Sequence, residues 1–186
     1  KEEVQKYIAQ IAFSGAEDFL GKYKSNDEID QFIGHFGLGF YSAYMVAQKV
    51  EIDTLSYKPG AEPVLWICDG SSEYLIEKGT RKTRGTEITL FIDKDNDEYL
   101  EEHRLKEILK HYCSFLPYPV YLGGTLINSK PPLWTKPASE CSQRDYLEFY
   151  RYLYPMEEDP LFWVHLNVDY PFHLQGILYF PKIRRD

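Results

Sequence analysis

Three glycines within six residues, directly ahead of the apolar run 41–46, constrain this chain more than any other feature. The stretch reads Gly34-His35-Phe36-Gly37-Leu38-Gly39-Phe40. Glycine lacks a Cβ, so a ligand can approach the backbone closely and φ can be positive. A glycine-rich turn that opens a helix also leaves N–H groups for an anion, above all phosphate. The pattern predicts a loop that holds nucleotide phosphates or, alternatively, a tight turn packed against a neighbouring helix.

The spacing of this loop, G-x-x-G-x-G, differs from two better-known phosphate loops. Gly15 and Gly21-Lys22 resemble a P-loop, but Tyr23 stands where a Ser or Thr would bind magnesium, and the glycines are too far apart. Gly37-Leu38-Gly39 begins a dinucleotide fingerprint, but Ser42 occupies the position of the third glycine. Neither of these two motifs therefore explains the loop.

Charge and cysteine content exclude several function classes. The 29 acidic and 21 basic residues give a net charge of −8, and no basic stripe follows the chain, which argues against a nucleic-acid partner. The basic cluster at 78–84 is interpreted as a solvated turn. Three widely spaced cysteines, without a C-x-x-C pair, predict no metal site and fit a reducing cytoplasm. No apolar run approaches the roughly 18 residues that would span a membrane.

The first 40 residues predict short helices separated by glycines. Val4, Ile8, Ile11 and Ala12 follow the spacing of an amphipathic helix. Ser14-x-x-Glu17 forms a capping box for a second helix over about 16–23. This organisation is typical of a mobile lid over a ligand, or of a plain helical surface connection.

A helix over 38–47 and four strands are predicted next. The strands are Val50–Ser56, Val64–Cys68, Glu73–Glu77 and Thr86–Ile92, and their short connections indicate an antiparallel meander. In the last strand, Thr86, Ile88, Leu90 and Ile92 share the face assigned to the core. The Thr86 hydroxyl would bond a neighbouring carbonyl or reach into a ligand pocket.

The second half predicts a long helix, a connector and a smaller unit. A helix begins at Asp95 or Asn96 and runs to about Phe115, with a buried stripe formed by Leu105, Ile108, Leu109, Tyr112 and Leu116. A short strand over 120–122 and the turn Gly123-Gly124 follow. The segment 128–139 holds three prolines and is interpreted as a connector between a domain at 1–127 and one at 140–186.

The unit after the connector predicts one helix and one hairpin. Ser142-x-x-Asp145 caps a helix that runs to about Tyr154. Strands at 162–168 and 174–180 follow. Phe162, Val164, Leu166 and Val168 form the apolar face of the first strand, and His165 on the other face is assigned to solvent or an interface. Because Lys1 is not an initiator Met and a strand-like run reaches Phe180, we interpret the chain as a piece of a longer protein.

Five motifs together resemble one protein family. They are Ile11-Ala12-Phe13-Ser14-Gly15, 33–43 around the glycine loop, Arg84-Gly85-Thr86-Glu87-Ile88, Pro132-Leu133-Trp134-Thr135 and Phe180-Pro181-Lys182. In this order and at these distances they resemble the ninety-kilodalton heat-shock chaperone (Hsp90) family, in particular its bacterial HtpG type. The resemblance covers essentially the whole chain.

The resemblance implies a fold and a ligand. The fold would be an α/β (α+β sandwich) ATP-binding fold of the GHKL or Bergerat type, with a mixed, largely antiparallel sheet covered by helices, followed by the start of an α/β middle domain. The ligand would be ATP or ADP with Mg²⁺, under a lid over about 9–40. The implied nucleotide-site residues are Ser14, Gly15, Gly34, His35, Phe36, Gly37, Leu38, Gly39, Phe40 and Thr86.

The resemblance also assigns roles within this set. Gly34, Gly37, Leu38 and Gly39 would offer backbone N–H groups to the phosphates, Phe40 would pack beside the sugar and base, and Thr86 would reach the adenine, with water. Trp134 would be a docking or client-facing residue at the start of the middle domain. Phe13 replaces a lysine that many relatives place near the phosphates, which removes a positive charge from the site.

The groups that would perform hydrolysis fall outside this chain. In the family, the general-base Glu, the Asn near magnesium and the Asp that reads adenine lie upstream of residue 1, and the Arg that reaches the γ-phosphate lies beyond residue 186. We therefore assign no catalytic residue and interpret Glu17 and Asp18 as capping and surface groups. The expected function is that of an ATP-dependent chaperone acting on unfolded or partly folded proteins, as a homodimer.

Two alternatives remain at this stage. The first is another ATPase of the same fold, either a histidine kinase or a type II topoisomerase subunit. The second is a non-catalytic interaction fragment in which the glycine loop is only a turn. Without the upstream part, the sheet over 50–92 would lose partner elements, so we expect the isolated chain to expose an apolar face, to self-associate and to bind ATP weakly or not at all.

Overall fold

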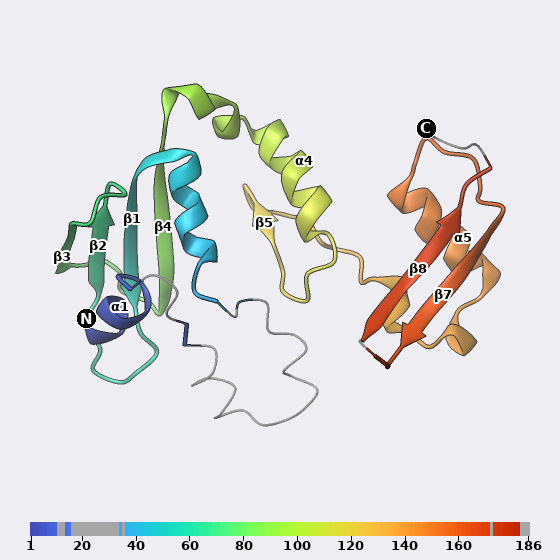
Figure 1. Ribbon diagram of the computed structural model, residues 1–186, viewed down its shortest axis with the longest axis horizontal. Helices are drawn as coiled ribbons and strands as arrows, with labels where there is room; N and C mark the ends of the chain where they lie inside the picture. The colour runs from blue at the N-terminus through green and yellow to red at the C-terminus, as the bar shows by residue number, and fades with distance from the viewer. Residues whose placement is uncertain (11–13, 16–33, 35, 172, 183–186) are drawn as a thin grey trace. The chain divides into compact units, whose positions relative to one another are not determined.

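The computed structural model describes residues 1–10, 14–15, 34, 36–171 and 173–182 (Figure 1). The chain divides into two compact units, Lys1–Glu107 and Ile108–Asp186, and the division falls inside helix α4, Glu102–Cys113. Each unit has its own hydrophobic cluster. The domain boundary placed at 128–139 from the sequence stays a prediction.

The first unit is built on a four-stranded antiparallel sheet with the order β3-β2-β1-β4 (Figure 1). Its strands are β1 Ala47–Leu55, β2 Val64–Cys68, β3 Tyr74–Lys78 and β4 Gly85–Ile92. All four predicted strands are present, within three residues of the expected bounds. The predicted meander is wrong for the last strand, because β4 pairs with β1 rather than with β3. Residues 79–84 carry the chain from one edge of the sheet to the other.

One face of this sheet holds the core of the first unit. Val50, Ile52 and Trp66 are at most 2% exposed. Two helical segments pack on that face: α1, Glu2–Tyr7, and the 3₁₀ helix η1, Gly39–Met45. Side chains of β1 alternate between this face and the opposite one, as the two-residue period of a strand requires. The predicted α/β class, a largely antiparallel sheet with helices, is confirmed.

Both helical segments are shorter than the sequence predicted. The helix expected over 38–47 is a 3₁₀ helix that ends at Met45, because Ala47 is already buried as the first residue of β1. Helix α1 ends at Tyr7. Ile11 and Ala12, expected to continue it, lie outside the described residues.

Strand β4 is less buried than the sequence predicted. Ile88 and Leu90 face the same side as Val50 and Ile52, yet they are 52% and 38% exposed. The reason is position, since β4 is an edge strand of the described sheet while the buried cluster is centred on β1 and β2. The expected burial of this strand is therefore wrong, and the expectation that the chain exposes an apolar face of the sheet is confirmed.

The long helix predicted from residue 95 to 115 is broken. A 3₁₀ helix, η2, spans Lys94–Leu100, and α4 starts only at Glu102. Between them Glu101 has extended backbone angles, φ −83° and ψ 123°, which interrupt the helical hydrogen bonds. No residue of α4 is buried, and Tyr112 is 73% exposed, so the predicted buried stripe is wrong.

The second unit packs a helix against a hairpin. After the short strands β5 Tyr121–Leu122 and β6 Thr125–Leu126 come the 3₁₀ turns η3 Leu133–Thr135 and η4 Ala138–Glu140, helix α5 Gln143–Leu153 and strands β7 Phe162–Val168 and β8 Leu174–Phe180. Ser142 and Asp145 form the predicted capping box at the start of α5. The antiparallel hairpin of β7 and β8 is also confirmed.

The hairpin presents the face opposite to the one predicted. Trp163 and Tyr179 pack into the cluster with α5, whereas Phe162 and Val164 are 50% and 40% exposed. His165 shares the inner face, where its Nδ1 lies 2.7 Å from the Tyr146 hydroxyl of α5. The aromatic residue Tyr146 of α5 decides the choice, because Trp163 stacks on its ring and His165 contacts its hydroxyl.

Candidate functional site

The backbone of the glycine loop, residues 34–40, is open around its glycines. Gly37 has φ 66°, in the left-handed region that favours glycine, and a Cβ at Gly34 or Gly39 would meet no atom within 4 Å. Phe36 and Leu38 are 77% and 49% exposed. The loop backbone is therefore open to a ligand. His35 lies outside the described residues.

Phe40 fixes the end of this loop to the core. Its ring contacts those of Trp66 and Tyr44 edge to face, with centroids 5.7 and 6.3 Å apart. The Tyr41 hydroxyl donates to the Ile8 carbonyl, which joins η1 to the segment just after α1. Burial raises the pKa of the Tyr44 hydroxyl, which donates to the Cys68 carbonyl. A loop attached in this way has one end held by a packed core.

Thr86 lies in the wall of a pocket of about 560 Å³. Its Oγ1 is 2.7 Å from the Oγ1 of Thr54, the residue directly opposite on β1. The pocket lies among α1, the end of β1 and the loop after it, and its walls include Val4, Tyr7, Ile8, Ile52, Ser56 and Lys58. None of the described residues of the glycine loop lines this pocket, so the loop and Thr86 share a sheet face but not one cavity.

Gly15 lies next to Tyr7, a residue that lines the same pocket. A Cβ on Gly15 would stand 3.2 Å from the ring of Tyr7, which is a pocket residue. Most of the segment predicted as a lid over 9–40 lies outside the described residues, as do Phe13, Glu17 and Asp18. The predicted site residues thus fall into three described groups: 14–15, 34–40 without His35, and Thr86.

The sequence analysis missed Asp53, whose side chain holds the segment 79–84 that leads into β4 and Thr86. Asp53 Oδ2 accepts hydrogen bonds from Thr80 N, at 2.9 Å, and from Thr80 Oγ1, at 2.6 Å. The Thr80 hydroxyl holds the pKa of the Asp53 carboxyl below its usual range. Asp53 thereby ties residues 79–84 to β1. Only the period-two pattern, which places Asp53 on the face opposite to Ile52, hinted at its position.

The basic cluster at 78–84 is only partly solvated, contrary to the interpretation from sequence. Arg81 is half-buried and its Nη1 lies 3.3 Å from the Glu87 carboxylate of β4. Lys82 and Arg84 are exposed. The cluster therefore both attaches residues 79–84 to β4, through Arg81, and contributes exposed charges to the surface.

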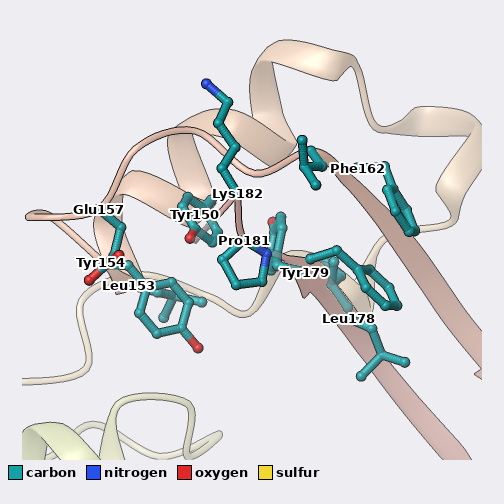
Figure 2. A pocket seen from close by; sticks show the side chains of 12 residues that line it. Tyr150, Leu153, Tyr154, Glu157, Phe162, Leu178, Tyr179, Pro181 and Lys182 are labelled. Carbon is teal, nitrogen blue, oxygen red and sulfur yellow. The ribbon is translucent and has the colours of Figure 1, made fainter. Parts of the chain in front are cut away.

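A second pocket, of about 690 Å³, lies in the second unit. Figure 2 shows Tyr150 and Leu153 of α5, and Tyr154 directly after it, beside the end of β8. Pro181 and Lys182, from the last of the five sequence motifs, also line it. None of the predicted nucleotide-site residues does.

Trp134 is a packing residue in this structure. Its ring lies 4.8 Å from that of Phe115 and 5.8 Å from that of Phe149, centroid to centroid, in the cluster of the second unit. Half-burial in this cluster leaves part of the indole accessible. The docking role given to Trp134 stays a prediction.

In the part of the chain that the structure describes, no three His, Cys, Asp or Glu side chains gather as metal ligands. Among those same residues, no helix has both the length and the apolar character that crossing a bilayer requires.

Comparisons with known proteins point to one family over nearly the whole chain. A family model described as "Hsp90 protein" matches residues 123–186. Chaperone protein htpG of Bacteroides fragilis is 57% identical over 98% of this chain, and the Porphyromonas gingivalis HtpG is 49% identical over all of it. A mitochondrial TNF receptor-associated protein 1 homolog of Dictyostelium discoideum is 35% identical over 98%. The chain spans 29% of the length of the two bacterial relatives and 26% of the third.

Proposed function

This chain belongs to the Hsp90 family, as an HtpG-type fragment, and on that premise we propose that it is part of an ATP-dependent molecular chaperone. Its share of the nucleotide site would be the glycine loop and Thr86. In the full-length protein, ATP binding would close the lid and hydrolysis would reopen it. The substrates would be unfolded or partly folded proteins, and the working form a cytoplasmic homodimer.

The backbone of the glycine loop carries this proposal. Gly37 adopts a left-handed conformation and its neighbouring glycines have no side chain to block an approaching phosphate. Gly34, Gly37, Leu38 and Gly39 would donate N–H groups to ATP or ADP, with Phe40 supporting the sugar and base. His35, Phe36, Ser14 and Gly15 would border the same ligand.

No catalytic residue is assigned to this chain. Hydrolysis requires a positioned base and charge stabilisation at the transferred phosphoryl group. Within the described residues, no carboxylate cluster is available to hold Mg²⁺. The ATPase activity would therefore depend on residues that the full-length protein supplies, among them the ligand of Mg²⁺.

The alternatives proposed from sequence are less well supported. The HtpG relatives align with 98 to 100% of this chain, including the part after residue 131, where a histidine kinase or a topoisomerase subunit would not be expected to match. A non-catalytic interaction fragment remains the contrasting hypothesis. It predicts that changing the glycine loop alters stability and leaves nucleotide affinity unchanged.

The experiment is a calorimetric titration of Mg-ADP into the full-length protein that carries this chain. Gly37→Asp places a carboxylate where the phosphates would bind, so we expect the affinity to fall by about tenfold or more through repulsion and steric block. Gly124→Asp is the matched control, because Gly124 also has positive φ, 83°, with open space around it, in the β5–β6 turn. Equal ADP affinity in both variants would refute the phosphate site.

A further inference from the structure

The Tyr41 hydroxyl joins the start of η1 to the end of α1. It donates to the Ile8 carbonyl at 2.6 Å, in a partly buried position. The direction of this bond is fixed, because a carbonyl oxygen can only accept. A helix leaves its last carbonyls without partners of its own, so Tyr41 caps α1 from a position 33 residues further along the chain. Burial raises the pKa of the Tyr41 hydroxyl, which therefore keeps its donor hydrogen at neutral pH.

The backbone of Tyr41 is bonded to the glycine loop itself. Its N–H donates to the Leu38 carbonyl at 3.0 Å, and the Ser42 hydroxyl donates to the Gly39 carbonyl at 2.6 Å. Leu38 and Gly39 are two of the residues whose N–H groups are proposed to meet the phosphates. Because these bonds join the two loop residues to Tyr41 in one turn, the direction of their N–H groups follows the orientation of Tyr41.

Packing of Phe40 does not by itself set this orientation. Its ring contacts that of Trp66 edge to face, but most of the free energy of such packing comes from burial, which has no direction. Phe36 and Leu38 are exposed, so burial holds that part of the loop only weakly. A hydrogen bond, in contrast, has a preferred angle as well as a distance. The bond of Tyr41 is therefore the contact that can fix how the turn faces relative to α1.

We propose that Tyr41 is a positioning residue of the phosphate site, whose hydroxyl orients the glycine-loop N–H groups by bonding the end of α1. This rests on the proposed function, under which those groups bind the phosphates of ATP or ADP. Tyr41 acts through the backbone of Leu38 and Gly39 rather than by contact with the nucleotide, since its hydroxyl is directed at Ile8. Loss of the hydroxyl should therefore weaken binding of the phosphates and spare binding of the adenosine.

The test compares Mg-ADP with adenosine, which has the same base and sugar without phosphates. Affinities are measured by calorimetry on the full-length protein that carries this chain and on its Tyr41→Phe variant, which keeps the ring and loses the hydroxyl. We expect the ratio of ADP to adenosine affinity to fall about threefold to tenfold, the range expected for one hydrogen bond. Tyr99→Phe is the matched control, because Tyr99 is also a half-buried tyrosine in a 3₁₀ helix of the first unit. It should leave the ratio unchanged.

A second measurement follows the loop without any nucleotide. Amide hydrogen exchange over residues 37–42 should be faster in Tyr41→Phe, since the turn is then held by packing alone. Exchange over β2, Val64–Cys68, should stay the same, because the lost bond does not involve that strand. In a Gly37→Asp background, Tyr41→Phe should change the affinity ratio little, since the phosphate contact through which Tyr41 acts has already been lost.

The outcomes separate this inference from the proposed function. If the full-length protein binds Mg-ADP and Gly37→Asp weakens that binding, the phosphate site stands. The positioning role is then wrong if Tyr41→Phe lowers both affinities by the same factor, lowers neither, or changes their ratio no more than Tyr99→Phe does. It is equally wrong if exchange over 37–42 is unaffected. If the full-length protein binds no ADP, or Gly37→Asp has no effect, the proposed function is refuted and this inference falls with it.

Discussion

Adjacent residues of β1 hold the start of β4 from both faces of the sheet. Asp53 accepts two hydrogen bonds from Thr80 on the polar face, and Thr54 bonds the backbone and side chain of the Gly85-Thr86 pair on the helix-covered face. Strand alternation makes this division possible, because neighbouring side chains point to opposite sides. The position of Thr86 thus depends on two neighbouring side chains of β1.

Gly79 is the glycine in this region with the least space around it. A Cβ at this position would lie 2.3 Å from Asp53 Oδ1 and 2.8 Å from Val64 N. We expect Gly79→Ala to lower the free energy of unfolding by about 1–3 kcal/mol, since backbone and a held carboxylate must move. Urea unfolding followed by tryptophan fluorescence, with Trp66 in the same core, measures this.

Gly39→Ala supplies the comparison for that measurement. The substitution is the same and lies in the same unit, but a Cβ on Gly39 meets no atom within 4 Å. It should change stability by about 0.5 kcal/mol or less, and alanine can even favour the helical turn. Equal losses at Gly79 and Gly39 would contradict the tight packing around Gly79.

At the level of elements, the sequence predicted the start of one helix correctly and the length of another incorrectly. The capping box of α5 formed as its spacing predicts, with the Ser142 hydroxyl accepting from Asp145 N and the Asp145 carboxylate accepting from Ser142 N. The single helix expected over 95–115 did not form, because Glu101 is extended. A helix cap depends on residues three positions apart, so it can be predicted from the local sequence. The continuity of a helix also depends on the tertiary contacts of its faces, which the local sequence does not show.

Ser142→Ala should destabilise α5 and with it the second unit. Loss of the cap leaves a backbone N–H at the helix start without its side-chain acceptor, at a cost of about 1 kcal/mol. Thermal unfolding followed by circular dichroism is a suitable measurement. Ser139→Ala, at an exposed position in η4, should leave the midpoint unchanged. A cap without effect would mean that the packing of α5 on the hairpin dominates.

At the scale of the whole molecule, exposed apolar side chains lie on both units. In the first unit they include Ile88 and Leu90 on β4, and in the second they include Phe162, Val164 and Leu178 on the outer face of the hairpin. An open edge strand with an apolar face favours pairing with another chain. The chain spans only 29% of its bacterial relatives, so partners from the rest of such a protein are absent here.

We therefore expect this chain, expressed alone, to self-associate as its concentration rises. Sedimentation velocity over a tenfold concentration range should show an increasing average mass. Ile88→Thr combined with Leu90→Thr should reduce it, since threonine keeps the strand while making its face polar. Leu75→Thr on the opposite face, at the other edge of the sheet, should reduce it less. A monomer at every concentration would contradict this expectation.

The sequence by itself determined the local features of this protein. Two-residue periods located the strands within three residues, the S-x-x-D spacing located the start of α5, and the glycine spacing located an open loop with a left-handed residue at Gly37. Each of these depends on interactions between neighbours along the chain. The order of the five motifs likewise sufficed for the family, which the comparisons with relatives then supported.

Only the tertiary structure decided how those elements combine. It placed β4 beside β1, turned Trp163 and His165 toward α5, and brought Thr54 against Thr86 and Asp53 against Thr80. The side-chain hydrogen bonds among these contacts join residues 19 to 32 positions apart. A strand with an aromatic residue on each face, or a polar residue in an alternating pattern, is compatible with several partners in sequence. The choice among them is made by burial and hydrogen bonding in the folded chain.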